Sequence, residues 1–154
     1  MTGRGSRGWV DVWRSLFRIG VGAFWLYFAS QKWTGVAWMR PLIEKSAQTN
    51  PVPGLHDLLA QVAAPNWQLF AIAQGVAETA VAVLLILGLA TRPAAVVGTL
   101  LAINLSLTVA FLNPDVGARW LYYLAVLVNL EVAVNGAGSL ALVRSRSVPA
   151  WLRS

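Results

Sequence analysis

The fold is decided by residues 67–112, which read WQLFAIAQGVAETAVAVLLILGLATRPAAVVGTLLAINLSLTVAFL. Two apolar stretches, 67–90 and 93–112, are each close to the roughly 20 residues that a helix needs to cross a bilayer. They are joined by only Thr91 and Arg92. A link this short makes the two helices an antiparallel pair. The segment is therefore typical of a helical hairpin embedded in a membrane.

Two further apolar stretches, at about 15–33 and 120–135, complete four predicted spans. We therefore expect an all-α chain that forms one antiparallel four-helix membrane bundle over residues 1–154, with basic tails at 1–14 and 139–154. The first and second spans are separated by a long Pro-rich loop. Within this loop, four apolar residues recur at helical spacing and predict a short amphipathic helix: Leu55, Leu58, Leu59 and Val62. This segment is either a functional lid or a plain linker that rests on lipid.

The composition of the chain agrees with a membrane protein. Hydrophobic residues make up 57% of the 154 positions and charged residues only 12%, against about 25% charged in ordinary soluble domains. The net charge of +6 comes from arginines that flank apolar runs, which does not match the clustered surface of a nucleic-acid-binding protein. The chain has no cysteine and one histidine, so we expect no metal site and no cofactor held covalently or by metal ligation.

The distribution of basic residues predicts the orientation in the membrane. Three arginines precede the first span, one lies in the short link and three lie in the tail, whereas the opposite side carries fewer basic residues. The positive-inside rule places the first set in the cytoplasm. We therefore expect both termini in the cytoplasm and the long loop outside, in the inner membrane of a prokaryote. The residues on the predicted cytoplasmic side are Arg4, Arg7, Arg14, Arg92, Arg144, Arg146 and Arg153, and those on the other side are Arg40, Lys45 and Arg119, with Lys32 at a helix end.

Among the ionisable residues inside the predicted spans, three carry the most weight: Arg18, Glu78 and Glu131. Each charge costs about 2.5–3.5 kcal/mol to insert, so it normally faces a partner or a cavity. At about 1.5 Å of rise per residue, Glu131 lies nearer the predicted cytoplasmic edge than Glu78 and is easier for Arg18 to reach. We therefore predict a structural Arg18–Glu131 ion pair. Glu78, with Gln74 one turn away, is left as the candidate for proton exchange, although such polar residues also hold helices together.

Several short motifs resemble those of the DoxX family, which includes the DoxD-like small subunit of thiosulfate:quinone oxidoreductase. An Arg18-Ile19-Gly20 start and Lys32 near the end of the first span precede the long loop. The segment from Glu78 through Leu87-Gly88-Leu89-Ala90-Thr91-Arg92-Pro93 is the most specific part. The similarity covers residues 14–140 and ends with Trp120-Leu121-Tyr122-Tyr123 and Asn135-Gly136-Ala137-Gly138. In the family, an Arg and a Leu-Asp often follow the last motif, whereas Ser139-Leu140-Ala141 stands here.

The resemblance implies a small four-helix membrane protein that takes part in quinone-coupled or thiol-related redox chemistry beside a partner protein. By position, Arg18, Lys32, Glu78 and Arg92 match the recurring polar residues of the family. We expect a quinone to be the ligand, with other complex subunits or a second copy as partners in the bilayer. A non-catalytic accessory or assembly subunit is the alternative, and a transporter is a weaker one. The residues expected to bind the quinone are Arg18, Trp25, Gln74, Glu78 and Arg92.

Overall fold

The computed structural model describes residues 3–141, and within this range every regular element is a helix. The prediction of an all-α chain is therefore confirmed for the described residues. Four helices are long and four elements are short. The long helices are α1 (Gly3–Trp33), α4 (Trp67–Leu87), α5 (Thr91–Thr108) and α6 (Val116–Asn135). The short elements are α2 (Met39–Thr49), α3 (Leu55–Leu58), the π-helical turn η1 (Leu59–Ala63) and the 3₁₀ turn η2 (Ala110–Leu112).

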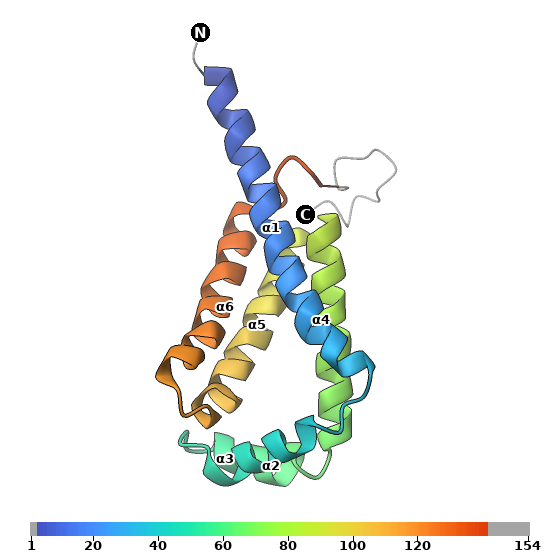
Figure 1. Cartoon of the computed structure of the whole chain (residues 1–154), viewed down its shortest axis with the longest axis vertical. Coiled ribbons are helices and arrows are strands. Elements are labelled where there is room, and N and C mark those ends of the chain that lie inside the picture. Colours follow the sequence, from blue (N-terminus) through green and yellow to red (C-terminus); the bar gives the residue numbers. More distant parts are fainter. Residues whose placement is uncertain (1–2, 142–154) are drawn as a thin grey trace.

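The long helices run alternately up and down, as Figure 1 shows. The main contacts pair α1 with α4 and α5 with α6, and α4 meets α5 to join the two pairs. The hairpin predicted at 67–112 is present, because α4 and α5 are antiparallel and only a short turn separates them. Gly88 makes that turn possible with a left-handed φ of 71°, and its N–H bonds to the carbonyls of Leu84 and Leu85.

Three helical segments within the described residues are long and apolar enough to cross a membrane: Trp67–Leu87, Thr91–Leu112 and Val116–Asn135. Large apolar side chains such as Leu69, Leu100 and Leu127 lie exposed on them. Exposed apolar faces of this extent are typical of contact with lipid. The predicted first span is not among these segments, because Arg18, Gln31 and Lys32 make α1 more polar than the others. α1 also begins at Gly3, well before the predicted start at residue 15.

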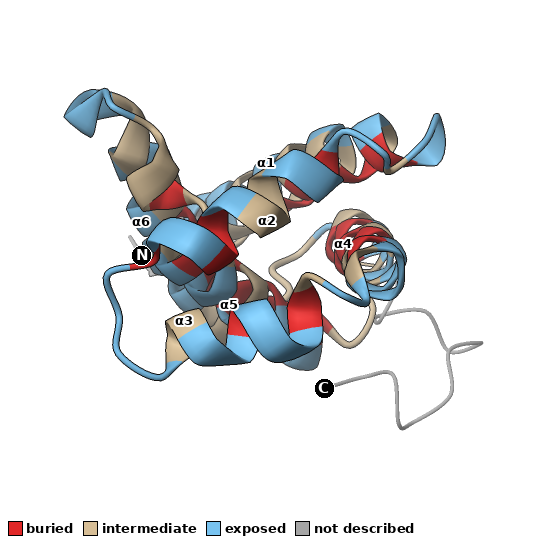
Figure 2. Cartoon of the chain, turned by 90° about the horizontal axis from the view of Figure 1, so that it is seen from below, coloured by how far each residue is buried: buried red, intermediate tan, exposed pale blue. Residues whose placement is uncertain are grey.

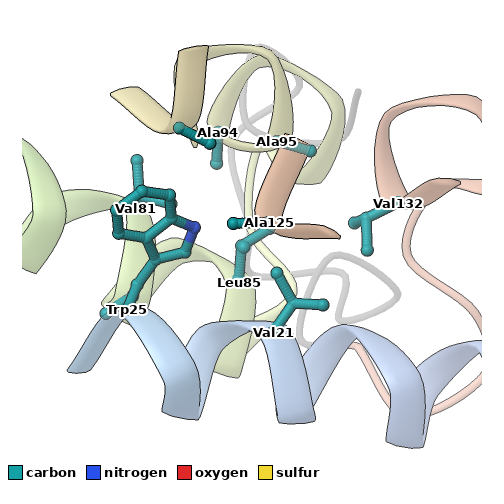
Figure 3. Close-up of a cluster of buried hydrophobic side chains, with 10 residues drawn as sticks. Val21, Trp25, Val81, Leu85, Ala94, Ala95, Ala125 and Val132 are labelled. Carbon is teal, nitrogen blue, oxygen red and sulfur yellow. The ribbon is translucent and has the colours of Figure 1, made fainter. Parts of the chain in front are cut away.

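The core lies where α1, α4, α5 and α6 meet. Figure 3 shows Val21 and Trp25 of α1 facing Val81 and Leu85 of α4 and the small residue Ala95 of α5. Small residues let the helix backbones approach closely, as is usual in membrane bundles. The residues of this cluster that are buried are Val21, Trp25, Val81, Ala82, Leu85, Ala94, Ala95, Ala102, Ala125 and Val132.

A polar contact inside this core joins α1 to α6 and packs against α5. Trp25 Nε1 donates a hydrogen bond to Asn129 Oδ1 of α6 at 3.0 Å, and Asn129 Nδ2 donates to the carbonyl of Ala125 at 2.7 Å. Gly98 of α5 leaves the space for both side chains, since a Cβ atom there would collide with Asn129 Oδ1. Both buried polar groups are thus satisfied, as a low-dielectric interior requires.

The long loop folds into a floor, formed by α2, α3 and η1, that closes one end of the molecule (Figures 1 and 2). Its own small core contains Ala47, Leu59 and Ala63. Ser46 Oγ donates to the carbonyl of Thr108 at 2.6 Å, and Asn50 Nδ2 donates to the carbonyl of Leu107 at 2.9 Å. These carbonyls end α5 and have no partner within that helix. The predicted helix at 55–62 corresponds to α3 and η1, whereas α2 was not predicted.

Candidate functional site

A cavity of about 670 Å³ lies between the floor and the long helices. Its volume is within the range of small-molecule binding sites, roughly 300–1,000 Å³. Most of its wall is apolar and includes four aromatic side chains: Phe28, Trp38, Phe70 and Tyr122. The floor contributes Met39, Leu42, Ile43, Ser46, Leu55, Leu58, Leu59, Val62 and Ala63, and α5 contributes Leu101, Asn104, Leu105 and Thr108.

A buried ion pair forms the main polar feature of this wall. Lys32 Nζ lies 2.7 Å from Glu78 Oε2, and the two residues are 7% and 0% exposed. Gln74 Nε2 donates to the other carboxylate oxygen, Glu78 Oε1, at 2.9 Å. Lys32 Nζ also donates to the carbonyl of Phe28 at 3.3 Å. Both oxygens of the carboxylate therefore accept hydrogen bonds, and the two buried charges neutralise each other.

The pair forms because the end of α1 lies level with the middle of α4. Trp33, next to Lys32, donates from Nε1 to Thr79 Oγ1, next to Glu78, at 3.1 Å. Gly75 permits the close approach: a Cβ atom there would lie 3.3 Å from both Cβ and Cδ of Lys32. The α4 residues Gln74 and Glu78 are one turn apart and so share a helix face.

Trp38, at the start of the floor, covers the ion pair. Lys32 Nζ lies 5.6 Å from the centre of the Trp38 ring, within the range of a cation–π contact. Trp38 Nε1 donates to the carbonyl of Gln31 at 3.3 Å, which holds the ring against the end of α1. An aromatic surface thus lies beside a hydrogen-bond donor, Lys32, and an acceptor, Glu78, at one side of the cavity.

Two of the five residues predicted to bind the quinone line this cavity, Gln74 and Glu78. The other three do not. Trp25 is completely buried in the core and bonded to Asn129. Arg92 is exposed at the start of α5, and Arg18 is buried beside the end of α4, both at the other end of the molecule from the floor.

The predicted Arg18–Glu131 ion pair is wrong for the described structure. The Arg18 guanidinium donates to the carbonyls of Leu85, Ile86 and Leu140, the last at 2.7 Å. Glu131 is exposed on α6 and accepts a hydrogen bond from Asn135 Nδ2 at 2.6 Å. The depth of a residue along its helix does not say which way its side chain points. Carbonyls at a helix C-terminus carry partial negative charge and take the place of the expected carboxylate.

Lys32 lies at a helix end, as expected, but it is not among the residues that the sequence predicts to bind the ligand. The partner of Glu78 comes from the floor end of α1. Counted from Trp67, Glu78 lies roughly 16 Å along α4, and α1 ends level with this point. The one signal in the sequence was the match of both Lys32 and Glu78 to the recurring polar residues of the family.

Within residues 3–141, no group of three or more His, Asp or Glu side chains is placed to hold a metal ion. The polar groups that the site presents are the Lys32 ammonium, the Glu78 carboxylate and the Gln74 amide, which make hydrogen bonds in largely apolar surroundings. The site suits an uncharged, mostly apolar ligand, because the ion pair is neutral as a whole and most of the remaining wall is apolar.

Comparison with known proteins agrees with this architecture. The family model DoxX matches residues 14–113, which include α1 from Arg14 onward, the floor, α4 and α5. No curated protein and no solved structure matches the chain. The matched region contains both partners of the buried ion pair and most of the cavity wall. The chain belongs to the DoxX family of membrane proteins.

Proposed function

We propose that this protein is a membrane subunit that binds a quinone in the cavity and takes part in quinone-linked redox chemistry with a partner protein. The observation that carries the proposal is the Lys32–Glu78 ion pair in the wall of an otherwise largely apolar cavity. A quinone ring is uncharged and flat, and its two oxygen atoms need a donor in the oxidised form and an acceptor in the reduced form.

Different residues of the cavity supply the donor and the acceptor. Lys32 Nζ donates to a quinone carbonyl oxygen, and the Glu78 carboxylate accepts a proton from a quinol hydroxyl. Gln74 holds the second carboxylate oxygen and keeps the side chain in place. Because the sequence has no cysteine and a single histidine, the proposal places the redox cofactor on the partner protein.

We also propose how the molecule lies in its membrane. α1 crosses together with α4, α5 and α6 as an antiparallel four-helix bundle, and its buried polar residues Arg18 and Lys32 face other helices rather than lipid. Both termini and Arg92 lie in the cytoplasm, by the excess of arginine on that side. The floor then lies at the outer face of the inner membrane of a prokaryote, and the cavity lies in the outer half of the bilayer.

Equilibrium binding tests the proposal. The protein in lipid nanodiscs is titrated with short-chain benzoquinone and naphthoquinone, and binding is followed by quenching of tryptophan fluorescence, since Trp38 lines the cavity. The variant is the double substitution Lys32→Met and Glu78→Gln, which removes both charges and leaves no buried unpaired one. A hydrogen bond to a charged group contributes about 1.5–3 kcal/mol, so we expect a Kd about 10–100 times higher.

The matched control is Glu131→Gln, which neutralises an exposed carboxylate outside the cavity. We expect the Kd of this variant to equal that of the wild type. A wild-type protein that binds neither quinone contradicts the proposal. Co-purification of an obligatory partner without any quinone binding would favour the accessory subunit instead.

A further inference from the structure

We infer that the ligand of this cavity carries a long apolar tail and enters sideways from the membrane, between the floor-side halves of α4 and α5. The inference rests on the proposed function and adds to it the class of quinone and its route. A tailed quinone dissolved in the bilayer would pass through this opening with its ring first, and its tail would stay in the gap between the two helices.

The spacing of the α4–α5 pair changes along its length. The two helices meet at the turn after Leu87 and separate toward the floor (Figure 1). Near the turn, Leu85 of α4 and Ala95 of α5 are completely buried. Near the floor, Phe70 and Ala73 of α4 line the cavity and are nevertheless exposed. The α4–α5 pair is therefore tightly packed near the turn, whereas near the floor its cavity-lining residues are accessible.

The first helix of the floor, α2, is fastened near both of its ends. Ser46 and Asn50 bond to the last carbonyls of α5. The Arg40 guanidinium lies 5.8 Å from the centre of the Trp67 ring at the start of α4. Exit through the floor would break these contacts, whereas exit between α4 and α5 breaks none of them. On the α1 side, Trp38 covers the ion pair and bonds to the carbonyl of Gln31.

The cavity residues of α4 and α5 that are exposed or partly exposed near the floor are mostly apolar. They include Phe70, Ala73 and Leu101, and one amide, Asn104, which is exposed. The Asn104 side chain makes no hydrogen bond to another described residue. An apolar passage that begins in lipid favours an alkyl or prenyl tail and disfavours charged, water-soluble substrates. The neutral ion pair inside selects an uncharged ring in the same way.

The experiment measures how fast two quinones exchange with the protein in nanodiscs. One is a prenylated quinone supplied in the lipid, and the other is the same ring without a tail, added from water. The variant Ala73→Trp narrows the opening, and its control Leu69→Trp adds the same side chain to an exposed position of α4 outside the cavity. We expect association of the prenylated quinone to slow at least tenfold in Ala73→Trp and to remain unchanged in Leu69→Trp. Asn50→Ala, which loosens the floor, should leave that rate unchanged.

The possible results distinguish failure of the entry route from failure of the proposed function. Association of the prenylated quinone at the wild-type rate in Ala73→Trp, or faster association in Asn50→Ala, overturns the route. Equal wild-type affinity for the ring with and without the tail overturns the tailed ligand and leaves the proposed function standing. Wild-type protein that binds neither compound overturns both. If Ala73→Trp does not elute as a single species, Ala73→Leu replaces it, and a smaller slowing is expected from the smaller side chain.

Discussion

Lys32 and Glu78 form the most demanding contact of the molecule at the scale of single residues. Both charged groups are buried, and each is stabilised by the other and by one further hydrogen bond. Glu78 accepts this bond from Gln74, and Lys32 donates it to the Phe28 carbonyl. Removing one partner of a buried ion pair costs about 3–5 kcal/mol, whereas replacing both by uncharged groups is often neutral. Under the proposed function, the same two side chains therefore contribute both to the stability of the fold and to ligand binding.

The first prediction concerns this coupling. Glu78→Gln leaves Lys32 buried without a counter-charge, so we expect it to lower the free energy of unfolding by about 3–5 kcal/mol. The double variant Lys32→Met and Glu78→Gln should lose clearly less than the single one. Unfolding titrations in mixed detergent micelles measure both values. A double variant that loses as much as the two single variants Glu78→Gln and Lys32→Met together would show that the charges do not interact.

The second prediction concerns Gly75, against which the Lys32 side chain packs. Gly75→Leu forces a larger side chain into this contact, and overpacking of this kind typically costs about 1–3 kcal/mol. It also displaces Lys32, so quinone binding should weaken together with stability. The control is Gly20→Ala, because nothing lies within 4 Å of the added Cβ; we expect it to be neutral or to stabilise by up to about 1 kcal/mol. Wild-type affinity and stability in Gly75→Leu would contradict the packing.

At the scale of elements, the C-terminal end of α4 depends on Arg18. Its guanidinium donates to the carbonyls of Leu85 and Ile86 and also to that of Leu140, in the segment that follows α6. That segment bonds to α1 as well: Leu140 N donates to Ser15 Oγ at 2.9 Å, and Ser139 N donates to the carbonyl of Asp11 at 3.2 Å. One arginine thus ties three parts of the chain together.

The third prediction follows from this contact. Arg18→Leu removes the donor of the part-buried carbonyls of Ile86 and Leu140, whereas the Leu85 carbonyl keeps its bond from the Gly88 N–H. A buried carbonyl left without a donor costs about 1–3 kcal/mol. We expect thermal unfolding in detergent at a clearly lower Tm. Glu131→Gln should change stability by less than about 0.5 kcal/mol, since its carboxylate is exposed. If the two substitutions together destabilised less than Arg18→Leu alone, the ion pair first expected from the sequence would regain support.

The elements differ in how well the sequence predicted them. Hydropathy located the three apolar helices α4, α5 and α6. The two-residue link between 67–90 and 93–112 correctly predicted that α4 and α5 are antiparallel. α2 was missed because its position depends on Ser46 and Asn50 reaching carbonyls at the end of α5, a contact that no local pattern records. The Lys32–Glu78 pair was missed for a similar reason. Spacing gives the height of each residue on its own helix, but not the offset between α1 and α4.

At the scale of the whole molecule, the placement in the membrane is testable because the chain has no native cysteine. The fourth prediction uses two single-cysteine variants: Asp57→Cys in the floor and Gly8→Cys near the start of α1, both at exposed positions. In intact cells, a membrane-impermeant maleimide should label Asp57→Cys, and should label Gly8→Cys only after permeabilisation. The reverse pattern would contradict the orientation. Labelling of both in intact cells would contradict a crossing by α1.

The central claim is that a quinone ring binds against Lys32 and Glu78 in the cavity, and photo-crosslinking tests it most directly. An azidoquinone is bound to the protein in nanodiscs and irradiated, and the modified residues are identified by mass spectrometry. We predict modification within the peptides that contain Lys32, Trp38 and Phe70, and its loss when excess quinone competes. Modification confined to the peptides around Arg18, Trp25 or Arg92, or spread evenly over lipid-facing residues despite competition, would contradict the claim.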